Sequence, residues 1–398
     1  MEHEYDYLIV GGGMAADAAA KAIAEGDPGA SVGILGDEVH APYERPPLTK
    51  GLWNEDKPPA EVVDLHTVDK GAQLHLGRHA VELDTTNRSV DDNQGDRWQY
   101  RRLLLAIGST PRTLPLTPHE RIIHFRTLTD YEQLRRLAGK GRHVAVVGSG
   151  FIGSEIAAAL VGAGCKVTMV FPSEEIGAGR FPDGLADFVT DYYRDKGVTM
   201  RTGVKVDGGR ADDNGVTLEL SDGSELAADV VVAGLGVTPN VLLADKAGLD
   251  VDDGIVVDEQ LRTSEPDIWA AGDVANFHNP ALGRRLRVEH ENAAISMGVL
   301  AGKNMAGDSE SYRELPFFYS DLFDLGYEAV GLLDNRLEVF EDWKVPNREG
   351  VVYYLDAGRV RGVLLWNVWG QVEAARDLIG QPGPVDMESL RGRIPRAV

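Results

Sequence analysis

The first 240 residues alternate between short apolar runs and longer stretches with helical spacing. Apolar runs at 7–10 and 144–147 each lead through a glycine-rich turn into an alanine-rich segment. Two more apolar runs, at 103–108 and 230–236, end in glycine. Repeated units of strand, turn and helix are typical of parallel sheets covered by helices. The pattern therefore predicts an α/β fold with two Rossmann-like domains.

The last part of the chain has a different pattern. From about residue 312 aromatic residues increase, and alternating runs at 350–355 and 361–366 flank the turn residues Asp356-Ala357-Gly358, which predicts antiparallel strands. A segment at 268–274, after the second domain, reads as a strand that runs into a turn with an acid, and it indicates a return to the first domain. We predict a first domain made of 1–113 and 238–311, a second domain of 114–237 inserted into it, and a small α+β C-terminal domain of 312–398.

Two glycine fingerprints carry the strongest chemical signal. Gly11-Gly12-Gly13-Met14-Ala15-Ala16 and Gly148-Ser149-Gly150-Phe151-Ile152-Gly153 each follow a strand pattern and open a helical one. Glycines there allow a tight turn and close approach of the backbone to a pyrophosphate, which the N–H groups at the start of the helix then bind. Asp37, after the next strand pattern, is placed to bind ribose hydroxyls, although a solvated acid beside Glu38 would give the same sequence. Two dinucleotides are the leading expectation.

The composition of the chain excludes several classes of partner and cofactor. The formal net charge of −23 argues against nucleic acid and anionic membranes, which require a basic face. The single cysteine, Cys165, excludes an intrachain disulfide, a CxxC pair and a thiolate-bound iron–sulfur cluster within the chain. No signal-peptide pattern and no apolar run of about 18 residues is found, so we expect no membrane span and a cytoplasmic location. No metal-ligand cluster stands out, and electrons would enter and leave through bound cofactors.

One loop sequence identifies a family. Residues 42–50, Pro-Tyr-Glu-Arg-Pro-Pro-Leu-Thr-Lys, resemble the PYxRPPLSK signature of flavin-dependent pyridine nucleotide oxidoreductases, which include bacterial ferredoxin reductases and apoptosis-inducing-factor-like proteins. The resemblance covers nearly the whole chain and includes both fingerprints and the segments 234–240 and 270–273. Segments 287–293 and 317–322 resemble the apoptosis-inducing-factor branch more closely than they resemble classical ferredoxin reductases. The resemblance implies FAD in the first domain and a nicotinamide dinucleotide in the second.

The resemblance also implies roles around the flavin. Lys50 would place an ammonium near flavin N5 and Glu155 would pair with it, because a buried lysine needs such a partner; Glu155 could also be an acid favoured by the start of its helix. His290 would lie beside the isoalloxazine, or be an ordinary structural histidine. Lys50, Glu155 and His290 are the catalytic candidates. The FAD-binding candidates are Gly11, Gly13, Met14, Ala15, Ala16, Asp37, Glu38, Arg45, Lys50, Ala80, Ala106, Gly108, Arg126, Gly272, Asp273, His290, Glu291, Asn292, Ala293 and Tyr319.

The residues after the second domain's second strand bear on the choice between NADH and NADPH. An acid there binds the ribose 2′-hydroxyl and repels a 2′-phosphate. The chain has Ser173-Glu174-Glu175 and no basic residue before Arg180, which favours NADH. Relatives have glutamate at or near Ser173, so Glu174 would substitute for it. The NADH-binding candidates are Gly148, Gly150, Phe151, Ile152, Gly153, Glu155, Ser173, Glu174, Arg180, Gly236, Glu289 and Glu328.

These observations predict an FAD-dependent NAD(P)H:acceptor oxidoreductase, in which hydride passes from NADH to FAD and electrons pass on to a quinone, an electron-transfer protein or oxygen. Two alternatives stay open. One is a ferredoxin–NAD(P)+ reductase of an oxygenase or cytochrome chain, whose acidic partner would need a positive docking face. The other is an NADH-dependent redox sensor with a long-lived charge-transfer complex that changes dimerisation, for which a homodimer would be one form.

Overall fold

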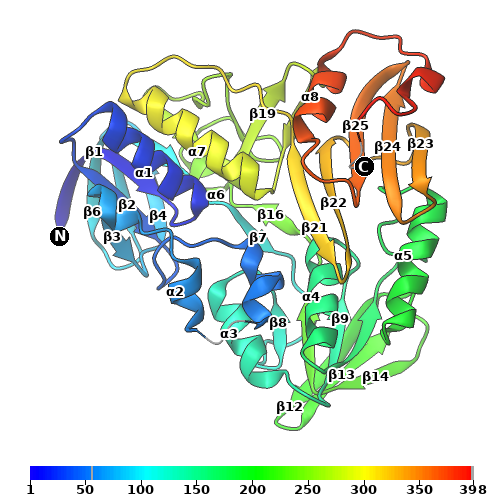
Figure 1. Ribbon diagram of the computed structural model, residues 1–398. Helices are drawn as coiled ribbons and strands as arrows, with labels where there is room; N and C mark the ends of the chain where they lie inside the picture. The colour runs from blue at the N-terminus through cyan, green and yellow to red at the C-terminus, as the bar shows by residue number, and fades with distance from the viewer. Residues whose placement is uncertain (55–56, 396–398) are drawn as a thin grey trace. The chain divides into compact units, whose positions relative to one another are not determined.

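The computed structural model describes residues 1–54 and 57–395 (Figure 1). The chain divides into two units. Unit 1 comprises Met1–Arg45, Ala60–Thr110 and Thr238–Pro316, and unit 2 comprises Pro46–Pro59, Pro111–Val237 and Phe317–Val398. Unit 2 thus contains most of the predicted inserted domain and C-terminal domain together with the loop that carries Lys50. The three-domain boundaries stay a prediction.

Unit 1 is built on a seven-stranded sheet with the order β3-β2-β1-β6-β5-β4, in which β18 also pairs with β6. Strands β1, β2, β3, β6 and β18 are parallel, and β4 and β5 join as antiparallel strands. All five residues of β2 are buried, as expected for a parallel strand covered on both faces. The strands are β1 (Glu2–Val10), β2 (Val32–Gly36), β3 (Gln73–Leu76), β4 (Ala80–Asp84), β5 (Ser89–Asp92), β6 (Arg97–Leu105) and β18 (Ile268–Ala270).

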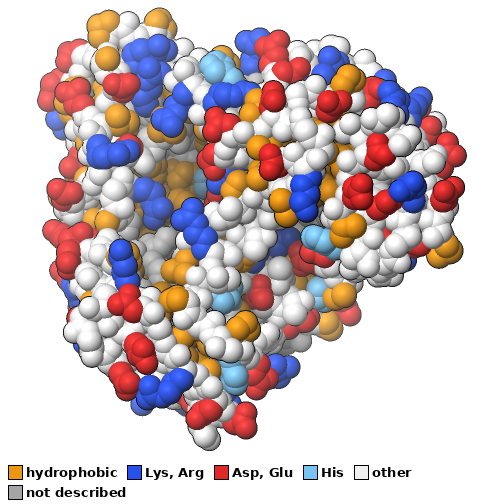
Figure 2. Space-filling model, turned by 180° about the vertical axis from the view of Figure 1, so that it is seen from behind, with side chains coloured by type: hydrophobic (Ala, Val, Ile, Leu, Met, Phe, Trp, Pro, Cys, Tyr) orange, Lys and Arg blue, Asp and Glu red, His pale blue; other side chains and the backbone are white. Residues whose placement is uncertain are grey.

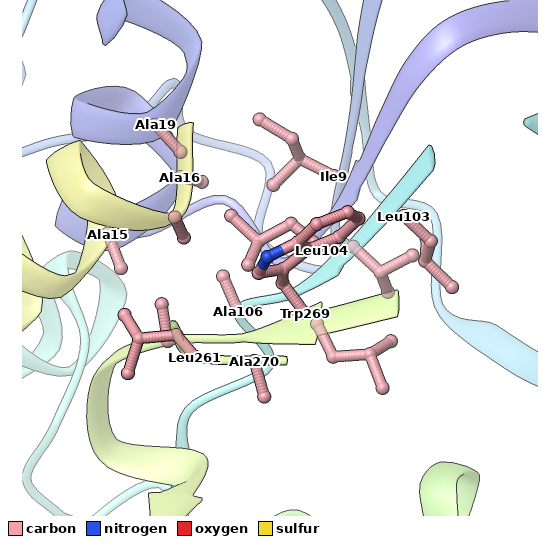
Figure 3. Packing of buried hydrophobic residues seen from close by; sticks show 14 of the residues in the cluster. Ile9, Ala15, Ala16, Ala19, Leu103, Leu104, Ala106, Leu261, Trp269 and Ala270 are labelled. Carbon is pink, nitrogen blue, oxygen red and sulfur yellow. The ribbon is translucent and has the colours of Figure 1, made fainter. Parts of the chain in front are cut away.

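Two helices of unit 1, α1 (Met14–Gly26) and α7 (Glu291–Ala306), lie side by side (Figure 1). Their backbones are in close contact, because a Cβ atom on Gly298 would lie 2.4 Å from the Ala15 carbonyl oxygen. Small residues of α1 share a buried cluster with Leu104 and Trp269 of the sheet (Figure 3). Unit 1 also contains a second sheet of β17 (Ile255–Val256), β19 (Ala275–Asn279) and β20 (Arg284–Arg287), with α6 (Leu242–Lys246) and the 3-10 helices Thr67–Lys70 and Gly272–Val274.

Unit 2 contains a second parallel sheet, with the order β11-β10-β9-β15-β8. A three-stranded antiparallel sheet, β12-β13-β14, belongs to the same unit. The strands are β8 (Ile122–His124), β9 (His143–Val147), β10 (Lys166–Val170), β11 (Thr199–Arg201), β12 (Val206–Asp212), β13 (Gly215–Leu220), β14 (Glu225–Ala228) and β15 (Val230–Ala233). The helices are α3 (Leu128–Leu137), α4 (Phe151–Gly162) and α5 (Asp183–Asp195), with the 3-10 helices Pro46–Thr49 and Gly51–Asn54.

The C-terminal segment forms an antiparallel sheet with the order β21-β22-β25-β24-β23. The predicted hairpin at 350–366 is confirmed, since Asp356 pairs with Arg359 across a turn in which Ala357 and Gly358 have φ angles of 49° and 71°. These elements are β21 (Phe317–Leu322), β22 (Leu325–Gly331), β23 (Glu338–Val345), β24 (Glu349–Asp356), β25 (Arg359–Trp366), α8 (Val372–Gly380) and a 3-10 helix at Met387–Leu390. The remaining short elements of the chain are α2 (Pro59–Val63), β7 (Ser109–Pro111) and β16 (Val237–Pro239). The predicted α/β fold with two Rossmann-like sheets and a small C-terminal sheet is confirmed.

Acidic and basic side chains are interspersed over the face of the molecule shown in Figure 2. The net negative charge of the chain is therefore not gathered into one field on that face. In the part of the chain that the structure describes, no helix has both the length and the apolar character needed to cross a membrane.

Candidate functional site

The first fingerprint connects β1 to α1 in unit 1. Gly11 has a φ of +116°, and a Cβ atom there would lie 2.1 Å from the Ala106 carbonyl oxygen, so only glycine fits. Gly13 is the N-cap of α1 in an extended conformation; no side chain of the described residues caps the helix. A Cβ atom on Gly13 would meet no atom within 4 Å. The helix thus begins with uncapped N–H groups beside open space, which is the cradle that a pyrophosphate requires.

A second turn of unit 1 lies beside this helix start. Gly272, with a φ of +75°, precedes Asp273, and a Cβ atom on Gly272 would lie 3.3 Å from the Cβ of Ala15 and 3.9 Å from that of Ala294. The turn therefore lies next to the first turns of both α1 and α7. Asp273 Oδ2 accepts a hydrogen bond of 2.7 Å from Ser109 Oγ. The structure thus brings the Gly272–Asp273 turn next to the first fingerprint, while the role of Asp273 toward FAD stays a prediction.

Helix α7 begins with the predicted flavin-side residues. His290 is its N-cap, with extended backbone, and Glu291 is its first residue. His290, Glu291 and Asn292 are half-buried, whereas Ala293 is buried. Glu289, predicted to contact NADH, lies in unit 1, where its Oε1 accepts a 2.6 Å hydrogen bond from Arg287 Nη1.

Two acids follow β2, and they differ in their surroundings. The Asp37 side chain is 74% exposed, and its Oδ1 lies 3.5 Å from His79 Nδ1. This exposure suits a ribose acceptor and a solvated acid equally. Glu38 is held instead by the loop that follows, through hydrogen bonds of 2.7 Å from the Tyr43 hydroxyl and 2.6 Å from Arg45 Nη2. Sequence reasoning named Glu38 and Arg45 but not the tyrosine that links them.

Three further FAD candidates of unit 1 lie at or just beyond the ends of strands. Ala106 follows β6, and its N–H donates to the Val10 carbonyl at 2.8 Å. Gly108 has a φ of +61°, and Ala80 is the first residue of β4.

The second fingerprint repeats the geometry of the first in unit 2. Gly148 has a φ of +115°, and a Cβ atom there would lie 2.3 Å from the Gly234 carbonyl oxygen. Gly150 is the extended N-cap of α4, again with no side-chain cap among the described residues and no atom within 4 Å of an added Cβ. Gly153 packs so closely that its Cβ would lie 2.2 Å from the Gly148 carbonyl oxygen. Both fingerprints therefore fit a bound pyrophosphate.

A buried carboxylate stands one turn into α4. Glu155 is 5% exposed, and its two oxygens accept from three donors: Lys50 Nζ, Thr49 Oγ1 at 2.5 Å and Ser320 Oγ at 2.6 Å. Lys50 is 14% exposed at its side chain, and its Nζ lies 5.0 Å from the centre of the Tyr319 ring. The structure thus brings Lys50, Glu155 and Tyr319 together within unit 2. Thr49 and Ser320, which complete the cluster, were missed, although each is adjacent in sequence to a named candidate.

The three residues predicted to distinguish NADH from NADPH, Ser173, Glu174 and Arg180, have different neighbours in the structure. Ser173 Oγ lies 3.5 Å from Ser149 Oγ in the fingerprint. Glu174 is exposed, and its Oε2 accepts from Thr202 Oγ1 at 3.2 Å, toward the end of β11. The Arg180 guanidinium carbon lies 4.4 Å from the centre of the Phe151 ring. Ser173 and Arg180 are therefore the candidates that directly adjoin the fingerprint.

Three further candidates lie elsewhere in unit 2. Glu328, on β22, accepts a 2.9 Å hydrogen bond from the Gly370 N–H. Gly236 has a φ of +79°. Arg126 precedes α3, and its backbone N–H donates to Asp130 at 3.0 Å. No group of three or more His, Cys, Asp or Glu side chains within residues 1–54 and 57–395 is arranged to hold a metal ion.

Comparisons with known proteins agree with this geometry. Residues 5–298 match the family described as pyridine nucleotide-disulphide oxidoreductase, and residues 301–349 match the C-terminal domain of apoptosis-inducing factor, mitochondrion-associated. The chain is 33% identical to apoptosis-inducing factor 1, mitochondrial, of Dictyostelium discoideum, over 95% of this chain and 80% of that protein. It is 34% identical to the ferredoxin–NAD(+) reductase component of the anthranilate 1,2-dioxygenase system of Burkholderia cepacia, over 96% of each.

The fold is similar to that in the crystal structure of the covalent putidaredoxin reductase–putidaredoxin complex, with a TM-score of 0.90 and 29% identity, over 97% of this chain and 95% of that chain. The resemblance seen in the sequence is thereby confirmed, as is the predicted use of FAD and NAD(H). The chain belongs to the pyridine nucleotide-disulphide oxidoreductase family and is an FAD-dependent NADH oxidoreductase related to apoptosis-inducing factor and to bacterial ferredoxin–NAD(+) reductases.

Proposed function

We propose that Lys50 and Glu155 are the charged groups that serve hydride transfer in this oxidoreductase. The observation that carries the proposal is the buried Glu155 carboxylate, which is held by the Lys50 ammonium and by the hydroxyls of Thr49 and Ser320. Bound FAD would supply the redox chemistry, namely a hydride acceptor for NADH and a donor of electrons to the acceptor. Lys50 supplies a fixed positive charge close to the aromatic ring of Tyr319, where a preorganised ammonium can stabilise developing negative charge.

The first fingerprint is proposed to hold FAD. The uncapped start of α1 binds the pyrophosphate, Asp37 and the backbone near Ala80 bind the adenosine end, and Asp273 accepts from the ribityl chain. The start of α7, from His290, lies toward the flavin. The closeness of Gly272 to Ala15 and Ala294 supports this assignment, because one ligand at this turn would contact both helix starts.

The second fingerprint is proposed to hold NADH. The open N-cap at Gly150 supports a pyrophosphate on α4, and Glu174 with no basic residue before Arg180 favours NADH over NADPH. Glu155 stands on the same helix, five residues beyond that N-cap, so the ion pair is fixed relative to the nucleotide site.

A ferredoxin-type protein is the acceptor that a specific observation favours. The chain aligns over 96% of the length of a ferredoxin–NAD(+) reductase component and matches a structure of a reductase in complex with putidaredoxin. A screen of purified ferredoxins, quinones, ferricyanide and oxygen as acceptors tests this choice. Turnover with a ferredoxin well above that with quinones is expected; faster turnover with quinones would point to a quinone reductase.

The sensor alternative, the homodimer and the cytoplasmic location stay predictions. Relatives include proteins named as mitochondrial as well as bacterial reductase components, so fractionation of the source cells decides location. Sedimentation of the purified protein with and without NADH tests the sensor: a change in mass together with slow turnover would favour it, and constant mass with fast turnover would exclude it.

Anaerobic titration of the purified holoprotein with NADH, followed by stopped-flow absorbance, tests the role of the ion pair. Lys50→Met is expected to slow flavin reduction by about tenfold or more. Lys196→Met is the matched control, because Lys196 also pairs with an acid of unit 2, Asp324 at 2.8 Å, and is not among the described hydrogen-bond donors to Glu155. Equal reduction rates in wild type and Lys50→Met would overturn the proposal.

A further inference from the structure

The loop of residues 77–79 connects β3 to β4 in unit 1 and lies against the end of β2. The Gly77 N–H donates to the Glu38 carbonyl at 3.1 Å, and the Arg78 N–H donates to the Gly36 carbonyl at 2.9 Å. Because β3 is the parallel neighbour of β2, its carboxyl end emerges on the edge of the sheet where ligands bind in such folds. The loop therefore follows Asp37 along this edge, on the side away from the first fingerprint.

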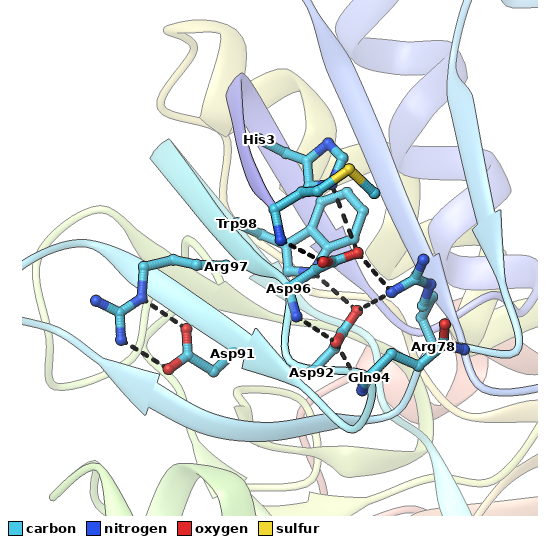
Figure 4. A network of polar contacts seen from close by, with 9 residues as sticks. His3, Arg78, Asp91, Asp92, Gln94, Asp96, Arg97 and Trp98 are labelled. Carbon is cyan, nitrogen blue, oxygen red and sulfur yellow. Dashed lines mark hydrogen bonds and ion pairs between the residues drawn. The ribbon is translucent and has the colours of Figure 1, made fainter.

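The turn between β5 and β6 holds this loop in place (Figure 4). Arg78 Nη1 donates to Asp92 Oδ2 and to Asp96 Oδ2, each at 2.8 Å. The Asn93 side-chain oxygen accepts from the His79 N–H at 3.0 Å, and the Gln94 side chain donates to the Gly77 carbonyl at 3.0 Å. Every residue from Gly77 to His79 is thus bonded to the turn.

Asp92, one of the two acids that accept hydrogen bonds from Arg78, is not a surface acid. The Asp92 carboxylate is fully buried and also accepts from Trp98 Nε1 at 3.1 Å. Burial alone would raise the pKa of Asp92, but backbone hydrogen bonds and the Arg78 guanidinium outweigh it and lower the pKa. A buried carboxylate needs a paired cation, so the guanidinium is confined to one position.

A neighbouring ion pair offers the contrast. Arg97 forms a two-point contact with Asp91, at 2.7 Å for each bond, on the same pair of strands (Figure 4). Its side chain is 49% exposed, compared with 20% for Arg78, and among the described residues it hydrogen-bonds to Asp91 rather than to the loop. Arg97 is therefore a matched arginine that does not hold the loop of residues 77–79.

We propose that Arg78 is a positioning residue for the adenosine end of FAD. The inference rests on the proposed placement of FAD at the first fingerprint. By tying the loop to the β5–β6 turn, Arg78 fixes His79 beside the ribose acid Asp37, 3.5 Å away, and fixes the backbone that leads to Ala80. Adenine is then bound by backbone groups that are already ordered, which lowers the entropic cost of binding.

Calorimetric titration of the apoprotein with FAD and, separately, with ADP tests the inference. Arg78→Met is expected to raise the Kd of both ligands by about tenfold, with the visible spectrum of bound FAD unchanged. Arg78→Lys should recover part of the affinity, and Arg97→Met should bind both ligands as wild type does. A loss of affinity for FAD much larger than that for ADP would show a disturbance that reaches the flavin and would overturn the proposal.

A second variant guards against a folding defect in Arg78→Met. Asn93→Ala removes the acceptor of the His79 N–H and leaves the buried ion pairs intact, and it is expected to raise the Kd of FAD and ADP by about threefold. Wild-type affinity in Asn93→Ala, or in a folded Arg78→Met, would overturn the inference. Failure of the wild-type apoprotein to bind FAD at all would instead overturn the proposed placement of FAD on which the inference rests.

Discussion

Gly298→Ala at the contact of α1 and α7 tests both the packing of unit 1 and the placement of FAD. Glycine to alanine inside a helix ordinarily stabilises by about 1 kcal/mol. Here the new Cβ would lie 2.4 Å from the Ala15 carbonyl oxygen and 2.9 Å from the Ala18 Cβ, about 1 Å inside normal contact. The backbone carbonyl cannot rotate away, so the helices must separate, at an overpacking cost of about 2–3 kcal/mol. The net loss is about 1–2 kcal/mol.

The matched variant is Gly302→Ala, one turn further along α7. Its Cβ would lie 2.5 Å from the Ala19 carbonyl oxygen, so the steric cost is the same, but Ala19 is outside the fingerprint that contains Ala15. Both variants should lower the thermal unfolding midpoint by about 3–6 °C. Only Gly298→Ala should also weaken FAD binding, measured by equilibrium dialysis of the holoprotein. A raised midpoint would refute the close packing, and equal FAD affinities would refute the role of the α1 start.

Three further outcomes are expected. Lys50→Met leaves the buried Glu155 carboxylate with hydroxyl donors only and should cost about 2–3 kcal/mol of stability, whereas the double variant Lys50→Met/Glu155→Gln should regain most of the unfolding midpoint but not the rate of flavin reduction. Glu174→Arg should raise kcat/KM for NADPH relative to NADH by about tenfold; an unchanged ratio would remove Glu174 from the nucleotide site. Hydrogen bonds from the Lys196 ammonium and the Tyr192 hydroxyl hold the pKa of Asp324 at about 2, below its ordinary value of 3.8. The ionised carboxylate therefore stabilises the fold above about pH 4, and this contribution is lost as the pH falls toward 2. Because the carboxylate is 64% exposed, the contribution is less than about 1 kcal/mol. In Asp324→Asn the thermal unfolding midpoint should therefore depend less on pH between about 2 and 4.

The fold was predictable where local signals agree. Both fingerprints combine an apolar strand, glycines at a tight turn and an alanine-rich helix, and all of these act within about 20 residues. The structure places Gly11 and Gly148 in the same left-handed conformation, each against a carbonyl oxygen of a neighbouring strand end. The hairpin near Gly358 was predictable for a similar reason, since glycine readily adopts the positive φ that the turn requires. Ala357 also has a positive φ there, which an alanine does not itself favour.

Contacts made over long sequence separations were not predictable from the residues alone. Ser320 is 165 positions from Glu155. Its place beside Tyr319 marks the segment but does not indicate that its hydroxyl donates to a buried carboxylate on another element. Arg78 likewise has no motif around it, and its role depends on the turn at Asp92, which the sheet brings alongside. The direction of an exposed side chain was not predictable from the sequence either. Glu174 was identified as an acid after the second strand of the second domain, but in the structure its carboxylate accepts a hydrogen bond from Thr202 and is not directed to the fingerprint.

The position of Glu155 explains why its partners come from distant segments. The side chain lies on a helix whose start is fixed by the second fingerprint, where Gly153 packs on Gly148 with no room for a side chain. Because the helix cannot shift to satisfy the carboxylate, other segments must supply its hydrogen-bond donors. Thr49 ends a 3-10 helix, Lys50 follows it, and Ser320 lies on strand β21. Each hydroxyl reduces the cost of burying the charge and leaves the ammonium with one favourable position. Helix α4 and the Lys50 ammonium therefore constrain one another, so that displacement of either alters the position of the other.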